Sequence, residues 1–172
     1  MRKLLLISIV LVLTAGTFSG LYAQGPVSLE VQINKALLGL PYYQVFDRIE
    51  FQVEEGIVTL SGETTGYVLK STVEKALSKL TGVREVKNEI EVLPYSPYDD
   101  RLRVSVFRAI YFHPLFNYYS TRNRGSIHII VNNGDVRLAG AVRTESDKTT
   151  AGILARGVSG VFTVTNDLEV EA

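Results

Sequence analysis

The amino-acid sequence predicts an α+β protein made of two tandem αββαβ domains. Three observations carry this prediction. Most of the chain repeats itself at a fixed offset, each copy holds two short alternating segments joined by a glycine turn, and amphipathic helical segments stand on either side of them. In each copy this order packs two helices on one face of a three-stranded mixed sheet.

The repeat is clearest in two pairs of segments. Residues 49–62 (IEFQVEEGIVTLSG) align with residues 127–140 (IHIIVNNGDVRLAG), and residues 82–92 (GVREVKNEIEV) align with residues 160–170 (GVFTVTNDLEV), both at an offset of 78 residues. Upstream of Pro114 the offset is 73, so the second copy carries five additional residues after this proline. Internal similarity at a fixed period predicts a repeated structural unit.

Hydrophobic periodicity places the elements of each copy. Those of the first copy are a helix over 28–40, strands over 49–53 and 58–60, a helix over 69–80 and a strand over 83–92. In the second copy the second helix is weaker, because Asp147 stands where the first copy has Leu69 and Gly152 interrupts the pattern. We expect that helix to depend on a neighbouring segment for support.

Turn-forming residues divide the chain into two domains. The segment LPYSPYDD, residues 93–100, holds two prolines and two acidic residues, which is typical of a boundary. We therefore place the first domain at residues 27–93 and the second at residues 99–171. Six glycines at equivalent positions of the two copies are predicted to be structural: Gly56, Gly62, Gly82, Gly134, Gly140 and Gly160.

The first 23 residues have the three-part pattern of a secretory signal peptide. Two positive charges in MRK precede an apolar run and a segment rich in small residues, with a plausible cleavage site after Ala23. The apolar run is shorter than the ~20 residues that span a bilayer, and the rest of the chain holds no longer one. We therefore expect a periplasmic protein with no transmembrane span in its mature chain.

Composition excludes several classes of function. The chain has no cysteine, which removes disulfides, thiolate metal sites and cysteine nucleophiles, and its net charge is zero, so no overall field attracts nucleic acid. His113 is expected on the core side of its helix and His128 on an exposed strand face, and neither has metal-ligand spacing. We predict no enzyme activity, no catalytic residue, no cofactor, no metal site and no nucleic-acid partner.

The repeated motifs resemble those of the BON family, small domains named for bacterial osmotically induced and nodulation proteins. The resemblance rests on a G-x-V-x-L-x-G hairpin, here residues 56–62 and 134–140, and on a G-V-x-x-V-x-N-x-(I/L)-x-V segment, here residues 82–92 and 160–170. Each motif occurs twice, in the same order and spacing. The two copies cover almost the whole chain after residue 23.

The resemblance implies αββαβ domains in the periplasm or cell envelope, with no known catalytic activity. It also implies binding to phospholipid membranes or envelope components and support of envelope integrity under osmotic stress. We accordingly expect anionic phospholipid headgroups as the partner. The alternative is an envelope protein, in which case the chain is an adapter or scaffold without lipid affinity.

The two copies differ most in residues 101–124, the first helix of the second copy and the insertion after it. Aromatic side chains lie off the core face of this helix and alternate with arginine, where the first copy has Asn34, Leu38 and Gly39. Such a mixture suits a membrane interface, where rings settle at headgroup depth and guanidinium groups pair with phosphates. The candidate lipid or partner contacts are Arg103, Phe107, Arg108, Tyr111, Phe112, Phe116, Tyr118, Tyr119, Arg122 and Arg124.

Three placements of these aromatic residues are open at this point. They could pack between the two domains, contact lipid, or contact a partner protein or a second copy of the chain.

The two copies also differ in net charge. Residues 24–93 hold seven Lys and Arg against ten Asp and Glu, a net charge of −3, whereas residues 94–172 hold nine against eight, a net charge of +1.

Overall fold

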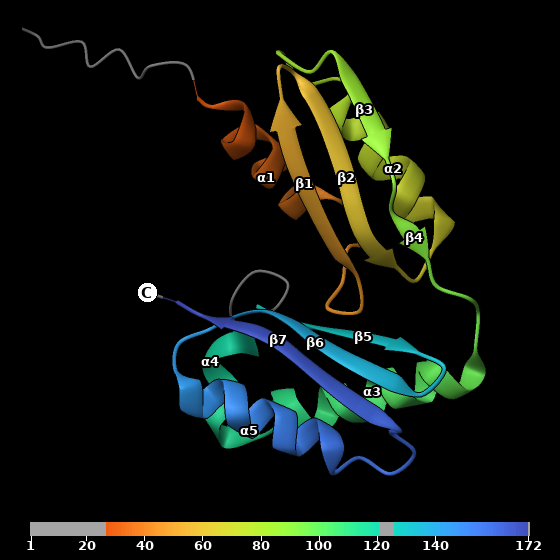
Figure 1. The fold of residues 1–172 in the computed structure, drawn as a ribbon, viewed down its shortest axis with the longest axis vertical. Coiled ribbons are helices and arrows are strands. Elements are labelled where there is room, and N and C mark those ends of the chain that lie inside the picture. The colour runs from red at the N-terminus through yellow and green to blue at the C-terminus, as the bar shows by residue number, and fades with distance from the viewer. Residues whose placement is uncertain (1–26, 121–125, 172) are drawn as a thin grey trace, which may run out of the picture.

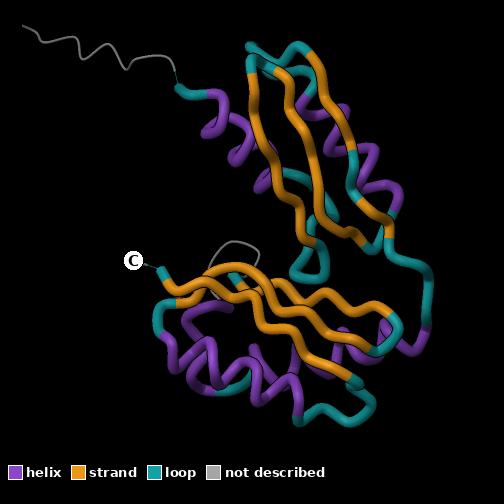
Figure 2. Tube along the Cα trace, in the orientation of Figure 1, coloured by secondary structure: helices purple, strands orange, loops and turns teal. Residues whose placement is uncertain are grey.

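The computed structural model of the chain describes residues 27–120 and 126–171, so the predicted signal peptide lies outside the described residues. It contains two units of the same construction, one standing over the other (Figures 1 and 2). The first unit holds α1 (Leu29–Gly39), β1 (Arg48–Glu54), β2 (Ile57–Thr64), α2 (Tyr67–Leu77), β3 (Glu85–Asn88) and β4 (Glu91–Val92). The second holds α3 (Pro97–Tyr111), η1 (Pro114–Phe116), α4 (Asn117–Ser120), β5 (Ile127–Asn132), β6 (Asp135–Val142), α5 (Glu145–Arg156) and β7 (Thr163–Val170).

In both sheets the middle strand has one antiparallel and one parallel neighbour. β2 pairs antiparallel with β1 and parallel with β3, and β6 pairs antiparallel with β5 and parallel with β7. Helices α1 and α2 cover one face of the first sheet, and α3 and α5 cover one face of the second (Figure 1). The predicted fold class is confirmed. One difference is that the last strand of the first unit is interrupted at Glu89 and Ile90, so β4 pairs with β2 as a separate segment.

Each hairpin has, at the end away from its turn, a glycine that a larger residue could not replace. A side-chain carbon at Gly62 would lie 2.2 Å from the Arg48 carbonyl oxygen, and one at Gly140 would lie 2.1 Å from the Ser126 carbonyl oxygen. Both glycines have φ above 100°, a left-handed conformation that other residues rarely adopt. A side chain at either position would therefore meet the backbone just before or at the start of the partner strand.

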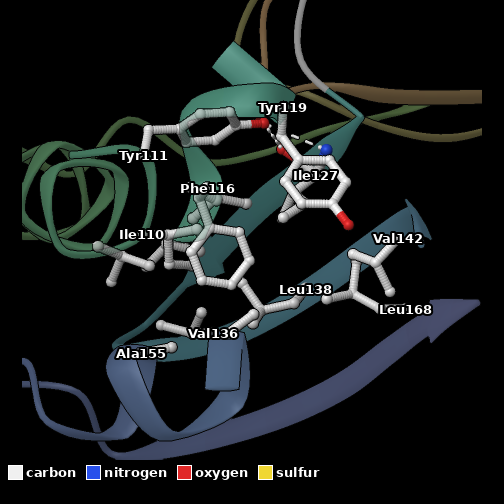
Figure 3. Close-up of a cluster of buried hydrophobic side chains, with 14 of the residues drawn as sticks. Ile110, Tyr111, Phe116, Tyr119, Ile127, Val136, Leu138, Val142, Ala155 and Leu168 are labelled. Atoms are coloured by element: carbon white, nitrogen blue, oxygen red, sulfur yellow. Dashed lines mark hydrogen bonds between the residues drawn. The ribbon is translucent and has the colours of Figure 1, made fainter. Parts of the chain in front are cut away.

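The additional residues of the second copy enter the core of their own unit. Segments η1 and α4 follow α3 directly and bury Phe116, which is 0% exposed, and Tyr119, which is 1% exposed. The Phe116 ring lies in the middle of the cluster, with Ile110, Leu138 and Ala155 around it (Figure 3). The described part of the insertion, up to Ser120, is thus part of the folded unit.

This insertion supports the helix that the sequence marks as weak. α5 buries Ala151 and Ala155 at the positions where α2 buries Val73 and Leu77. Smaller side chains on α5 leave room in the core, and interiors are packed to nearly constant density. The two aromatic rings of the insertion occupy that room.

The insertion also supplies a hydrogen-bond donor to Asp147, a polar residue of α5. Asp147, which takes the place of Leu69, accepts a hydrogen bond from the Tyr119 hydroxyl at 2.7 Å. The backbone N–H of Arg143 donates to the same hydroxyl at 2.7 Å. The neighbouring segment on which α5 depends is therefore the insertion.

The helix-free face of the second sheet is covered by the first unit. Ile130 is 4% exposed and Ala139 is 0% exposed, although neither belongs to the core between that sheet and its helices. The Glu63 carboxylate, at the end of β2, pairs with the Arg137 guanidinium on β6. The two units are therefore joined by an apolar contact and an ion pair as well as by the linker.

Replacing Phe116 with alanine is expected to lower the free energy of unfolding by about 3–5 kcal/mol, because it opens a cavity beside the alanines of α5. Urea denaturation followed by circular dichroism measures this. The matched control is Leu115→Ala, since Leu115 is the preceding residue and is 56% exposed. Its effect should stay within about 0.5 kcal/mol. Equal losses in both variants would contradict a core role for the insertion.

Candidate functional site

The loop between α1 and β1, residues 40–47, forms the first-unit side of the junction, and one carboxylate holds it. We call this segment the junction loop. Oδ1 of the buried Asp47 accepts hydrogen bonds from the Thr64 hydroxyl at 2.9 Å, the Thr65 N–H at 2.8 Å and the Thr65 hydroxyl at 3.0 Å. Its Oδ2 accepts from the Gln44 N–H at 3.0 Å. Bonds to both oxygens fix the junction loop against the end of β2.

Two contacts dock the junction loop on β5 of the second unit. The Ile129 backbone N–H donates to the Val45 carbonyl oxygen at 2.7 Å. The Tyr43 ring stacks on the His128 ring, with centroids 5.9 Å apart and an interplanar angle of 21°. Because β5 is an edge strand, the first contact satisfies a backbone group that its own sheet leaves unpaired.

Two of the predicted contact residues seal the same edge of β5 from within their own unit. The Tyr111 hydroxyl donates to the Ile127 carbonyl oxygen at 2.7 Å and accepts from the Ile127 N–H at 3.1 Å (Figure 3). The Arg103 guanidinium donates to the Val131 carbonyl oxygen at 2.6 Å. Burial raises the pKa of Tyr111 to about 12, so its hydroxyl stays protonated as a donor.

The expectation that Arg103 and Tyr111 contact lipid or a partner is therefore wrong. Each is only 4% exposed. The physical reason is that α3 lies along an edge strand, so residues beside its core face meet unpaired backbone groups instead of solvent. The same expectation is wrong for Phe116 and Tyr119, which form the core under the insertion.

Tyr118 is 43% exposed, and the Arg143 guanidinium carbon lies 4.8 Å from the centre of its ring. This is cation–π geometry within the second unit. Arg122 and Arg124 lie outside the described residues.

The remaining candidates, Phe107, Arg108 and Phe112, share one surface. Together with Val104 they form one wall of a groove of about 600 Å³, and residues 43–46 of the junction loop form the other wall. We call this the interdomain groove. It exists only where the two units meet, because each unit contributes one wall.

The interdomain groove combines three chemical features. Its lining is mostly apolar, with the half-buried Phe107 ring meeting the Phe46 ring edge-on at 6.0 Å. The Phe112 ring, at the C-terminal end of α3, is 72% exposed and lies 6.0 Å from the Phe107 ring. The exposed Arg108, one helical turn before Phe112, adds a positive charge at the rim.

His128 lies under the junction loop, so the expectation that it is exposed is wrong. Its ring is half-buried, and its Nδ1 has no hydrogen-bond partner in the described part of the chain. Burial lowers the pKa of His128, and the charge of Arg48 acts in the same direction, against the opposing influence of Asp47. A proton on this ring therefore works against the contact between the units.

The sequence analysis did not predict which residues of the second sheet contact the first unit, although a comparison of the two copies indicates them. Ile130 corresponds to Gln52 of the first copy, and Ala139 corresponds to Ser61. A strand face that is polar in one copy and apolar in the other predicts a covered face in the second. The comparison of copies therefore could have located the junction on this face.

Among the residues described, no group of three or more His, Asp and Glu side chains is placed to hold a metal ion. Within the same ranges, no helix is long and apolar enough to cross a membrane.

Replacing Tyr111 with phenylalanine is expected to lower the free energy of unfolding by about 1–3 kcal/mol, because it leaves the N–H and C=O groups of Ile127 buried without partners. Chemical denaturation measures the loss. Tyr95→Phe removes the same hydroxyl from a side chain that is 87% exposed and should have no such effect. A Tyr111→Phe protein as stable as the wild type would contradict the sealing role.

Acid is expected to destabilise the folded chain through His128. Its lowered pKa keeps the folded state unprotonated while the unfolded chain takes up a proton near pH 6.5, so stability is lost as the pH falls below that value. Denaturation at about pH 7.5 and about pH 5.5 measures the difference. His128→Gln should reduce it, whereas His113→Gln leaves His128 in place and should retain it. An unchanged pH dependence in His128→Gln would contradict this role.

Comparison with solved structures finds several matching chains, among them two structures of the protein CdsD. The C-terminal domain of CdsD, a structural protein of the type III secretion system of Chlamydia trachomatis, is 13% identical over 86% of this chain and 99% of that chain, with a TM-score of 0.31. A second CdsD structure is 14% identical over 84% of this chain and 93% of that chain, also with a TM-score of 0.31. TM-scores this low carry no argument about architecture or role. No curated protein matches the chain.

Comparison with protein-family models gives a direct result. The model of the BON domain matches residues 28–94 and again residues 99–172. The two matches together span most of the sequence, and each contains one of the two αββαβ units. The chain therefore belongs to the BON domain family, of which it carries two copies in tandem.

Proposed function

We propose that the protein binds the surface of anionic phospholipid membranes peripherally, through the interdomain groove and the Phe112 ring beside it. The observation that carries this proposal is a large aromatic ring, 72% exposed, next to an apolar groove and an exposed arginine. Aromatic rings favour headgroup depth, and a guanidinium group pairs well with a lipid phosphate.

The apolar and charged parts of this surface should act together. Burial of the Phe112 ring in the interface removes apolar surface from water, which contributes roughly 25 cal/mol for each Å². Arg108 adds an attraction to anionic headgroups that salt screens within about a Debye length. Because each contribution is small, binding should need both and should weaken at high ionic strength.

Membership in the BON family supports an envelope-type protein of the periplasm. Within our proposal, residues 1–23 direct export and are removed after Ala23, which leaves residues 24–172 as the mature chain. A peripheral membrane contact in that compartment would support envelope integrity under osmotic or other stress.

Vesicle co-sedimentation of residues 24–172 tests the proposal. Vesicles of phosphatidylcholine alone are compared with vesicles that also contain phosphatidylglycerol, each at low and high salt. The groove variant is Arg108→Ser with Phe112→Ser. The control variant is Arg156→Ser with Phe162→Ser, because Phe162 is 70% exposed and packs against Tyr98 at the opposite end of α3.

We expect the wild type and the control variant to bind anionic vesicles at low salt, and the groove variant to bind at least about tenfold more weakly. Circular dichroism checks that both variants are folded. Absence of wild-type binding to any vesicle would overturn the proposal and favour the alternative, a protein-binding adapter or scaffold that uses the same groove. Equal binding by both variants would remove the groove from the lipid contact.

A further inference from the structure

The two sheets differ in how they treat the edge formed by the first strand of each hairpin. In the second unit, β5 has outward backbone groups bonded at three residues: both groups of Ile127 by Tyr111, the N–H of Ile129 by Val45 and the C=O of Val131 by Arg103. Such covering is how proteins prevent an edge strand from pairing with another chain. The edge of β5 is closed.

The corresponding edge of the first unit, formed by β1, is open. Both hairpins have the same register, since Phe51 lies opposite Leu60 as Ile129 lies opposite Leu138. The outward backbone groups of β1 therefore belong to Ile49, Phe51 and Val53. Within residues 27–120 and 126–171, no hydrogen bond reaches these outward groups.

The repeat explains why this edge has no cover. Leu38 stands where the second unit has Tyr111, and Glu30 stands where it has Arg103. A leucine has no group that can bond a strand edge, and a glutamate cannot donate a hydrogen bond to a carbonyl oxygen as arginine does. Leu38 is also 49% exposed. It lines a groove of about 420 Å³ that runs beside β1 with Phe51 on its wall.

We propose that β1 pairs antiparallel with β1 of a second copy of this chain, which joins the two first-unit sheets into one continuous sheet. A two-fold axis at Phe51 places Ile49 opposite Val53 of the other copy and Phe51 opposite itself. This register uses the three residues whose backbone groups point outward. A symmetric pair of this kind forms each contact twice.

Charge on β1 matches the same register. With Phe51 at the axis, Arg48, which also pairs with Glu50 of its own strand, lies opposite Glu54 of the second copy, and Glu50 lies opposite the uncharged Gln52. Opposite charges in facing positions stabilise an antiparallel pair, and like charges in those positions destabilise it. The strand therefore carries self-complementary charge as well as an open edge.

A second sheet edge, that of β7, does not have this property. β7 also ends its sheet, but it carries Asp167 and Glu169 and no basic residue. Antiparallel pairing of β7 with itself would gather negative charge without compensation. The second copy is therefore assigned to β1.

Sedimentation velocity of residues 24–172 over a concentration series, without lipid, tests the pairing. We expect a monomer–dimer equilibrium. Arg48→Glu and Glu54→Arg should each raise the dissociation constant at least about tenfold, since each places like charges opposite one another at two symmetric positions. The double variant restores opposite charges and should restore the dimer. Lys87→Glu, on the exposed surface of β3, makes the same charge change away from β1 and should have no effect.

A chain that stays monomeric at every concentration would overturn the proposal, as would a double variant that dimerises no better than the single variants.

A second measurement, disulfide cross-linking, does not depend on charge. Because the chain has no cysteine, Glu50→Cys and Gln52→Cys proteins can be mixed and oxidised. The mixture should form more disulfide-linked dimer than either protein alone. Equal cross-linking in all three samples would indicate random collision and would also overturn the pairing. Neither measurement involves lipid, so the result is independent of the membrane proposal.

Discussion

The hydrogen bond from the Ile129 N–H to the Val45 carbonyl oxygen is the constraint on which the arrangement of the two units depends. It joins a strand edge of one unit to a loop of the other, and it requires that the loop hold one conformation. Asp47 supplies that conformation through bonds to both of its carboxylate oxygens. Without a fixed loop, the second sheet would lose the part of its cover that the junction loop provides.

The position of the interdomain groove follows from this constraint. Its two walls come from different units, so the groove has a defined shape only while the junction loop is docked. The lipid contact proposed for Phe112 therefore depends on a joint between repeats rather than on a feature of one BON domain. A protein with a single copy of the domain would lack one wall.

Much of the architecture could be predicted from the sequence because it depends on local rules. Turn glycines, strand alternation and helix periodicity are visible at short range, and the repeat confirms each of them twice. The candidate surface was predicted less well, since of the eight candidates in the described part of the chain only Phe107, Arg108 and Phe112 come together at the interdomain groove. Whether an aromatic residue beside a helix's core face is exposed depends on what lies next to that helix. Here an edge strand covers Tyr111, and space left by the alanines of α5 takes up Phe116.

The insertion and the alanines of α5 also constrain how the two copies could have diverged from a common ancestor. Small residues on the helix alone would have left a cavity, and aromatic rings added alone would have met the larger side chains that α2 still carries. Either change alone is therefore expected to destabilise the unit more than the two together, which makes the pair epistatic. At this core, residues of the two copies are therefore expected to be exchangeable only as a set.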